Sequence, residues 1–188
     1  MDIEAEKQII RQVRDGALEA YAELVTAYQH AVYNLVFRLT GSIEDAEDLS
    51  QETFLKALEA MDRFDESRPF FPWLYTIALN VVRNHCRRQS FLPPGSRSAS
   101  NPPAESGSKD PESLVGRKQA AERLFECVQQ LPEPQREAMV LRYYQDLSFE
   151  MLAEILEISL SAAKMRVYRG LQRLSLLMNP ENKDRQEN

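Results

Sequence analysis

The chain has 188 residues, of which 43% are hydrophobic and 28% charged, and this composition allows one large or two small globular domains while excluding disorder throughout. Its net charge of -6 argues against a protein that coats nucleic acid through bulk charge. A local basic face could still bind nucleic acid, so the distribution of charge matters more than the total.

The first half of the chain has the period of amphipathic helices. Apolar residues recur every three or four positions over residues 18–28 and again over residues 31–39, which predicts two helices with one buried stripe each. Gly41 is expected to end the second of these. Ser42 stands three residues before Asp45, an arrangement like a capping box, so we expect another helix to begin there.

That next helix is predicted to carry a polar face rich in acids. Its outward side chains are Asp45, Asp48, Gln51, Glu52 and Glu59. Such a face is either solvated, with first-turn acids that favour the helix dipole, or a docking surface for a basic protein partner.

The following segment changes from acidic to aromatic and basic. A helix is predicted to open at Pro72, a favoured first-turn residue, and to run to about Arg88. Aromatic residues mark its entry, and polar residues line one side: Phe64, Phe70, Phe71, Trp73 and Tyr75, then Thr76, Asn80, Arg83, Asn84 and Arg87. Aromatic rings can stack on unpaired bases, while Asn and Arg can read base edges and hold phosphates. Alternatively, the aromatic residues are core and the arginines only solubilise the helix.

Residues 91–113 are dense in Pro, Ser and Gly and are almost free of apolar side chains after Leu92. A segment of this composition cannot bury enough surface to offset the entropy of ordering, so we predict a flexible linker. The expected fold is all-α, with two small helical domains at residues 1–90 and 114–178 and a disordered tail at residues 179–188.

The second domain has the pattern of a helix-turn-helix. Ser148 is placed to cap a short helix over residues 149–156, residues 157–159 form a turn, and Ser159 or Ser161 can cap the last helix. The last helix is predicted to bury Ala163, Val167, Leu171 and Leu174, and to expose Lys164, Arg166, Arg169 and Arg173. A basic second helix is typical of major-groove recognition, although a generic helical hairpin with a solvated face shares much of this pattern.

In this order, three segments resemble the extracytoplasmic-function sigma factors, the smallest class of bacterial promoter-specificity subunits. DAEDLSQETFLKA resembles their polymerase-binding segment, and FFPWLYTIALNVVRNHCRR resembles their strand-opening segment. Residues 131–174 resemble their C-terminal helix-turn-helix. The resemblance covers nearly the whole chain outside the linker and tail.

The resemblance implies a role for each surface. The motif that docks the helical coiled coil of the largest polymerase subunit corresponds to Asp45, Asp48, Leu49, Gln51, Glu52 and Phe54. The part that captures unstacked bases of the minus-10 element corresponds to Phe64, Phe70, Phe71, Trp73, Asn80, Arg83, Asn84 and Arg87. Contacts to the minus-35 element correspond to Ser161, Lys164, Arg166, Arg169 and Arg173.

The resemblance also implies partners: RNA polymerase core, promoter DNA and an anti-sigma protein that holds the factor inactive. A flexible linker would let one partner cover both DNA-binding faces in one state and leave them spread along a promoter in the other.

Three positions depart from the family pattern. Glu157 stands where the turn commonly has Gly, and a left-handed conformation there would cost a non-Gly residue about 1 kcal/mol. Ala162 and Met165 replace residues that often carry hydroxyl groups, which removes possible phosphate contacts. We therefore expect a lower affinity for the minus-35 element or an unusual sequence preference.

Two other classes of function fit parts of the sequence. A stand-alone helix-turn-helix regulator would explain the second domain but not the acidic and aromatic helices. A metal-dependent nuclease could use Asp45, Asp48 and Glu52, whose i, i+3 and i+7 spacing brings carboxylates together. The sequence contains no second carboxylate cluster and no phosphate-binding loop that would support a nuclease.

The remaining expectations concern metals and location. Two cysteines and two histidines are too few for the usual zinc sites, and we expect neither a cofactor nor enzymatic activity. No apolar stretch approaches the roughly 20 residues of a membrane span, and no secretory signal opens the chain, so we expect a cytoplasmic protein without direct membrane insertion.

Overall fold

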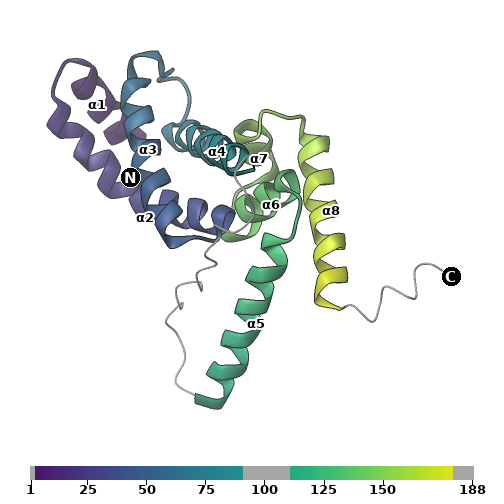
Figure 1. Cartoon of the computed structure of the whole chain (residues 1–188). Coiled ribbons are helices and arrows are strands. Elements are labelled where there is room, and N and C mark those ends of the chain that lie inside the picture. Colours follow the sequence, from purple (N-terminus) through teal and green to yellow (C-terminus); the bar gives the residue numbers. More distant parts are fainter. Residues whose placement is uncertain (1–2, 91–110, 180–188) are drawn as a thin grey trace.

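The computed structural model describes residues 3–90 and 111–179, and every regular element in these stretches is helical, as predicted (Figure 1). The first half contains α1 (Ile3–Arg14), η1 (Leu18–Ala20), α2 (Tyr21–Thr40), α3 (Ile43–Glu59), η2 (Met61–Arg63) and α4 (Phe70–Gln89). The second half contains α5 (Pro111–Gln129), α6 (Glu133–Met139), η3 (Val140–Tyr144), α7 (Phe149–Ile155) and α8 (Leu160–Met178).

The predicted linker falls mostly outside this description, at residues 91–110, as does the predicted tail from residue 180. Residues 111–113, which the composition assigns to the linker, belong to α5, whose first residue is Pro111. Proline is favoured at a first helical position because its missing N–H is not needed there. The helix therefore starts inside the Pro- and Ser-rich stretch.

The apolar stripes at residues 18–28 and 31–39 lie largely on one helix rather than on two, because α2 is continuous from Tyr21 to Thr40. No glycine, proline or capping residue separates the stripes, so the backbone hydrogen bonds run on without a break. Leu18 precedes α2 in the 3-10 turn η1 and is exposed rather than buried.

The boundary between α2 and α3 follows the sequence prediction. Gly41 ends α2 in a left-handed conformation with φ of 76°, which glycine adopts without a steric penalty. The Ser42 hydroxyl then accepts a hydrogen bond from the Asp45 N–H at 3.2 Å. This cap sets the start of the acidic helix.

Helix α4 begins at Phe70, two residues before the predicted start at Pro72. Pro72 still lies in the first turn, where a backbone N–H has no acceptor within the helix. Phe70 is only 1% exposed, and its ring lies 5.7 Å from that of Tyr28. The sequence pattern missed this start because it did not assign Phe70 to the core.

The second half forms the predicted helix-turn-helix. The hydroxyls of Ser148 and Ser159 cap α7 and α8, each accepting a backbone N–H at 3.2 Å. Leu171, predicted to be buried on α8, is 40% exposed, and Gly170 takes the buried position instead. A Cβ on Gly170 would lie 2.7 Å from Met139 Cγ, so the close contact between α8 and α6 needs glycine.

The two halves pack against each other. Phe37 of α2 stacks on Phe125 of α5 with ring centroids 5.4 Å apart, and Gln129 Nε2 donates a hydrogen bond to the Arg38 carbonyl at 2.8 Å. Farther along the interface, α4 contacts α7. The described arrangement is therefore closed, with the aromatic helix against the helix-turn-helix (Figure 1).

Candidate polymerase and nucleic-acid interfaces

The acidic helix α3 presents its polar face to solvent. Asp48 and Gln51 are exposed, Glu52 forms an ion pair with Lys56 at 2.6 Å, and the Asp45 carboxylate lies 3.2 Å from His85 Nε2. The pairs with Lys56 and His85 hold two of the acids against neighbouring side chains. Asp48 and Gln51 therefore remain the most available polar groups for an external partner.

Leu49 and Phe54, which the resemblance places in the polymerase-binding motif, are core residues. Leu49 is 4% and Phe54 8% exposed, because both lie on the apolar side of α3. They pack the helix against the core and offer little surface to a partner. Leu55 is the apolar residue that the sequence analysis missed: it is 62% exposed and lies three or four residues from Glu52 and Gln51, hence on the same face.

Most of the aromatic residues near the start of α4 form a cluster. Phe64 and Phe70 are buried, and their rings lie 4.9 and 5.5 Å from the ring of Trp73. In the described arrangement the side chains of Phe64 and Phe70 therefore offer little surface to bases, and their contact with DNA stays a prediction. Their mutual packing is the reason for this burial, since each ring fills space under the others. Phe71 and Trp73 are only partly buried, so part of each residue stays accessible.

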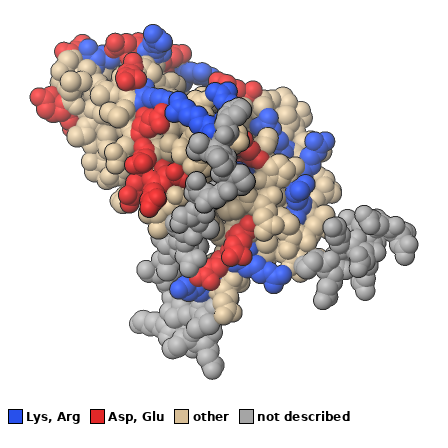
Figure 2. Space-filling model, in the orientation of Figure 1, with Lys and Arg blue, Asp and Glu red and all other residues tan. Residues whose placement is uncertain are grey.

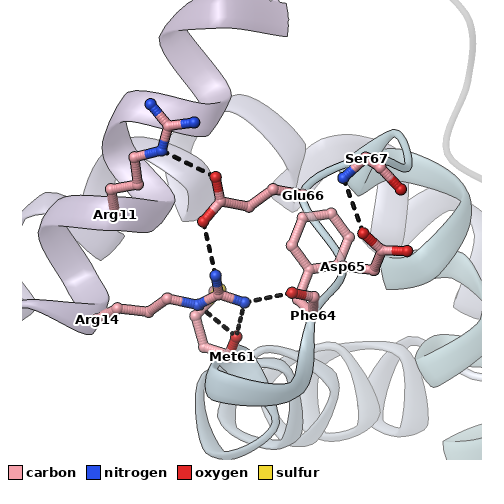
Figure 3. Close-up of polar contacts among 7 residues, drawn as sticks. All are labelled: Arg11, Arg14, Met61, Phe64, Asp65, Glu66 and Ser67. Carbon is pink, nitrogen blue, oxygen red and sulfur yellow. Dashed lines mark hydrogen bonds and ion pairs between the residues drawn. The ribbon is translucent and has the colours of Figure 1, made fainter.

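The α3–α4 loop, residues 60–69, is held by polar contacts from α1 (Figure 3). Arg14 contacts its backbone and, together with Arg11, binds Glu66. Asp65 accepts a hydrogen bond from the Ser67 N–H at 2.9 Å, and bonding by the Ser67 side chain and backbone lowers the pKa of Asp65. Phe64 anchors the loop in the core while Asp65, Ser67 and Arg68 are exposed.

The polar side of α4 has internal contacts along the helix. Asn80 and Arg87 are exposed, and Asn84 is partly buried. Arg87 donates to Asn84 Oδ1 at 3.0 Å, and Arg83 donates to Asn80 Oδ1 at 3.3 Å. The predicted minus-10 residues of this helix thus lie together on one side, as their spacing of three and four residues requires.

Arg83 also makes a bidentate polar contact between the two halves. Its Nε and one terminal nitrogen donate to the two carboxylate oxygens of Glu137 at 2.7 and 2.8 Å. The side chain of Glu137 is 4% exposed and that of Arg83 is 34% exposed. The hydrogen bonds to Glu137 raise the pKa of Arg83, which fixes its charge. This bidentate ion pair joins a predicted DNA-binding residue to the second domain.

Further contacts follow the same interface toward the start of α4. The Tyr75 hydroxyl lies 2.7 Å from Gln145 Oε1, and the Thr76 hydroxyl donates to the Ile155 carbonyl at 3.3 Å. A cleft of about 540 Å³ opens beside them, lined in part by Trp73, Arg68 and Glu157. Trp73 therefore faces a space shared by α4 and the helix-turn-helix.

The predicted recognition helix α8 keeps its basic face open. Ser161, Lys164, Arg169 and Arg173 are exposed, and Arg166 is partly buried. In Figure 2 the visible part of α8 carries Lys and Arg, whereas Asp and Glu lie over the first half of the molecule and over α5. Within the described stretches, the arginines of α8 form no ion pair.

The turn before α8 contains a non-glycine residue in the left-handed conformation. Glu157 adopts φ of 54°, in the left-handed region that glycine tolerates and other residues occupy at a cost of about 1 kcal/mol. Ala162 and Met165 offer no hydroxyl groups, and Met165 is 46% exposed. Ser161 lies near the helix start, with its hydroxyl 3.1 Å from that of Ser159.

Comparison with known proteins identifies both halves. The family model for sigma-70 region 2 matches residues 24–91, and that for sigma-70 region 4 matches residues 121–174. The RNA polymerase sigma-H factor of Pseudomonas aeruginosa is 30% identical over 94% of this chain and 95% of its own length. The ECF RNA polymerase sigma-E factor of Escherichia coli K12 is 33% identical, over 92% and 93%.

The chain belongs to the extracytoplasmic-function sigma factors. It therefore acts as an alternative sigma factor in transcription initiation, and the prediction of two helical domains with a helix-turn-helix in the second is confirmed. CnrH, solved in complex with the cytosolic domain of CnrY, superposes with a TM-score of 0.70 at 26% identity, covering 94% of this chain and 98% of CnrH. RpoE, solved with the anti-sigma factor NepR from Bartonella quintana, gives 0.69 at 26% identity, covering 85% and 96%.

Across residues 3–90 and 111–179, no three His, Cys, Asp or Glu side chains come together as a metal site. In the same stretches, no helix combines the length and apolar character that crossing a bilayer requires.

Proposed function

We propose that this sigma factor uses three separate surfaces for three tasks. Asp48, Gln51 and Leu55 on α3 dock RNA polymerase core, with Asp45 and Glu52 at the edge of the patch. An exposed leucine among acids suits a basic partner with an apolar contact point. The observation that carries this proposal is the separation of an acidic face on α3 from a basic face on α8, on different helices of one chain.

The minus-10 surface combines the exposed part of the α3–α4 loop with the open side of α4. Its members are Asp65, Ser67, Arg68, Phe71, Trp73, Asn80, Arg83, Asn84 and Arg87. Bases released from the duplex can stack on the accessible aromatic edges and bond to the amides. Melting costs about 1.4 kcal/mol per stacking step, which the captured bases and supercoiling offset, so we propose that this chain performs no catalysis itself.

The minus-35 surface is the exposed side of α8, with Lys164, Arg169 and Arg173 as its available cations, Arg166 beside them and Ser161 at the helix start. Arginine on a helix in the major groove binds base edges and phosphates. Apart from Arg166, which is partly buried, these residues already face solvent in the described arrangement. Duplex binding by α8 therefore needs no rearrangement of its side-chain partners.

The closed arrangement limits the minus-10 surface. Arg83 donates to both carboxylate oxygens of Glu137, so these two donors are not available to a phosphate until that pair separates. We propose that the two halves separate when the factor binds polymerase and promoter DNA. The exposed α8 face then engages DNA independently of this step, whereas α4 depends on it.

Control by an anti-sigma protein in the cytoplasm completes the proposal. The superposing RpoE structure is a complex with an anti-sigma factor. A partner that stabilises the contact between α4 and the second half would keep Arg83 occupied, which shifts the population toward the closed form. Isolation of the factor from unstressed cells should recover such a partner; recovery of polymerase alone would count against it.

The test of the proposed function is assembly with sigma-free bacterial core polymerase, followed by transcription from a library of genomic fragments. We expect a one-to-one complex and discrete new start sites whose alignment gives two promoter elements. A chain that binds duplex DNA but forms no complex with core would instead be a stand-alone regulator.

A further inference from the structure

The last residue of α1 reaches across to the α3–α4 loop. Arg14 Nε and one terminal nitrogen donate to the Met61 carbonyl at 3.0 and 2.9 Å, and the same terminal nitrogen donates to the Phe64 carbonyl. The other terminal nitrogen donates to Glu66 Oε1 at 2.6 Å (Figure 3). One guanidinium thus binds three residues of a single loop.

Glu66 is held from two sides. Arg11, one turn earlier on α1, donates from Nε to Glu66 Oε2 at 2.8 Å. The side chains of Arg14 and Glu66 are 23% and 25% exposed, whereas that of Arg11 is 60% exposed. The Arg14 contact is therefore the better shielded of the two and contributes more than an ordinary surface ion pair.

These contacts fix the part of the loop that bears its exposed side chains. Upstream, Phe64 is buried and Arg14 binds its carbonyl. At the centre, Glu66 is tied to α1, and the Arg68 N–H donates to the Asp65 carbonyl at 3.0 Å. With Phe64 and Glu66 both fixed, the directions of the exposed Asp65, Ser67 and Arg68 are set by groups that lie beneath them.

We infer that Arg14 is a positioning residue for base preference at the minus-10 element, acting from α1 without touching DNA. The inference rests on the proposed function of the loop. A planar guanidinium can bridge two carbonyls and a carboxylate at once because its donors point in fixed directions. A lysine ammonium would keep the charge but could not reproduce this pattern. Pairing also neutralises Glu66, which would otherwise repel nearby phosphates.

The experiment compares holoenzymes formed by the full chain and by Arg14→Gln, Arg14→Lys and Glu66→Gln, with Lys7→Gln as a control on the same helix. Transcription from promoters randomised in the minus-10 element gives the base preference at each position. We expect Arg14→Gln and Arg14→Lys to reduce the strongest preference by at least about fivefold, a part of what one stacked base contributes. Core affinity and duplex minus-35 affinity should stay unchanged, and Lys7→Gln should match the parent.

A merely structural role for Arg14 would lower thermal stability or weaken all promoters alike, with the preference profile unaltered, and that result would overturn the inference. Glu66→Gln removes the same link from the loop side, so the test survives if the Arg14 variants fail to fold. The double substitution Asp65→Ala with Ser67→Ala separates base reading by the loop from the positioning role of Arg14. If this pair alters the profile and the Arg14 variants do not, only the positioning role fails. If neither alters it, the loop does not read bases.

Discussion

The predicted minus-10 surface on α4 and the predicted minus-35 surface on α8 differ in what surrounds them. On α4, Arg83 is bound to a buried carboxylate of the other half, while Thr76 hydrogen-bonds to the Ile155 carbonyl. On α8, Lys164, Arg169 and Arg173 face solvent. The two helices that are predicted to bind DNA therefore differ in how accessible their binding residues are. The surface for duplex DNA is open, and part of the surface for single-stranded DNA is covered.

This difference has a physical cause in the kinds of contact that each surface makes. Duplex binding begins with phosphates and needs only exposed cations. Capture of single bases uses aromatic and amide groups, which also suit protein interiors and interfaces. Residues of the second kind pack readily against another domain when DNA is absent. In the closed arrangement, Thr76 and Arg83 on the polar side of α4 bond to the second half, while Asn80 stays exposed.

The largest expected effect comes from breaking the Arg83–Glu137 pair. Glu137→Arg places a second cation against Arg83, so the closed form should lose about 2 kcal/mol or more. The free chain should then bind a single-stranded minus-10 oligonucleotide at least about tenfold more tightly, which equals about 1.4 kcal/mol. Fluorescence anisotropy measures the binding, and X-ray scattering measures the expansion.

Glu126→Arg on α5 is the matched control, because Glu126 is an exposed acid on a different helix from Glu137. It makes the same change of charge at an exposed position and should leave both measured quantities close to those of the parent. Equal gains in the two variants would mean that net charge, rather than opening, controls the binding.

The second effect concerns α8. Arg169→Ala should lower affinity for minus-35 duplex by about 1–3 kcal/mol if it contacts a base, or reduce the salt slope by about one if it contacts a phosphate. The loss should be the same in the free chain and in Glu137→Arg, because α8 is open in both. A loss confined to the opened variant would show that α8 also is covered.

A third change isolates α4. Asn80→Ala removes an exposed amide from its polar side, so we expect slower promoter opening with unchanged minus-35 affinity. Permanganate footprinting of unpaired thymines measures the opening rate. A simultaneous loss of duplex affinity would contradict the division of tasks between the two helices.

The polymerase-binding face offers a change outside both DNA surfaces. Asp48→Arg together with Gln51→Ala replaces exposed groups on α3, so core affinity should fall by about tenfold while the fold remains intact. Duplex binding by the free chain should not change, as an electrophoretic shift would show. Unchanged affinity for core would remove α3 from the docking surface.

The smallest effect is at the turn before α8. Glu157 is strained at φ of 54°, so Glu157→Gly should raise the free energy of unfolding by up to about 1 kcal/mol. Thermal denaturation measures the gain, with Glu126→Gly as a control that should destabilise because it lies within α5. A decrease for Glu157→Gly would mean that its flexibility in the unfolded chain outweighs the relief of strain.

Local rules predicted the helices and their caps well. Gly41, Ser42, Ser148 and Ser159 act through groups within a few residues of themselves, which the sequence displays directly. The break predicted within α2 failed because apolar stripes alone do not mark a helix end. Gly170 was missed on α8 since its burial depends on Met139, a residue of another helix.

The site residues also divide into those that local spacing predicts and those that depend on packing between distant segments. Exposed polar residues such as Asp48, Asn80 and Arg169 could be placed from helical spacing. Phe64 and Phe70 could not, since an aromatic residue near a loop can stack on a base or on its neighbours, and only the packing decides. The contacts of Arg14 with the loop and of Glu137 with Arg83 span 47 or more residues in sequence, so no local pattern predicts them.

The most direct test of the central claim is binding of two DNA probes, duplex minus-35 and single-stranded minus-10, to the free chain and to the holoenzyme. Aligned start sites from the transcription library supply the probe sequences. We expect the free chain to bind the duplex but to bind the single strand at least about tenfold more weakly than the holoenzyme does. Equal affinity of the free chain and the holoenzyme for the single strand would show that the second half does not cover the minus-10 surface.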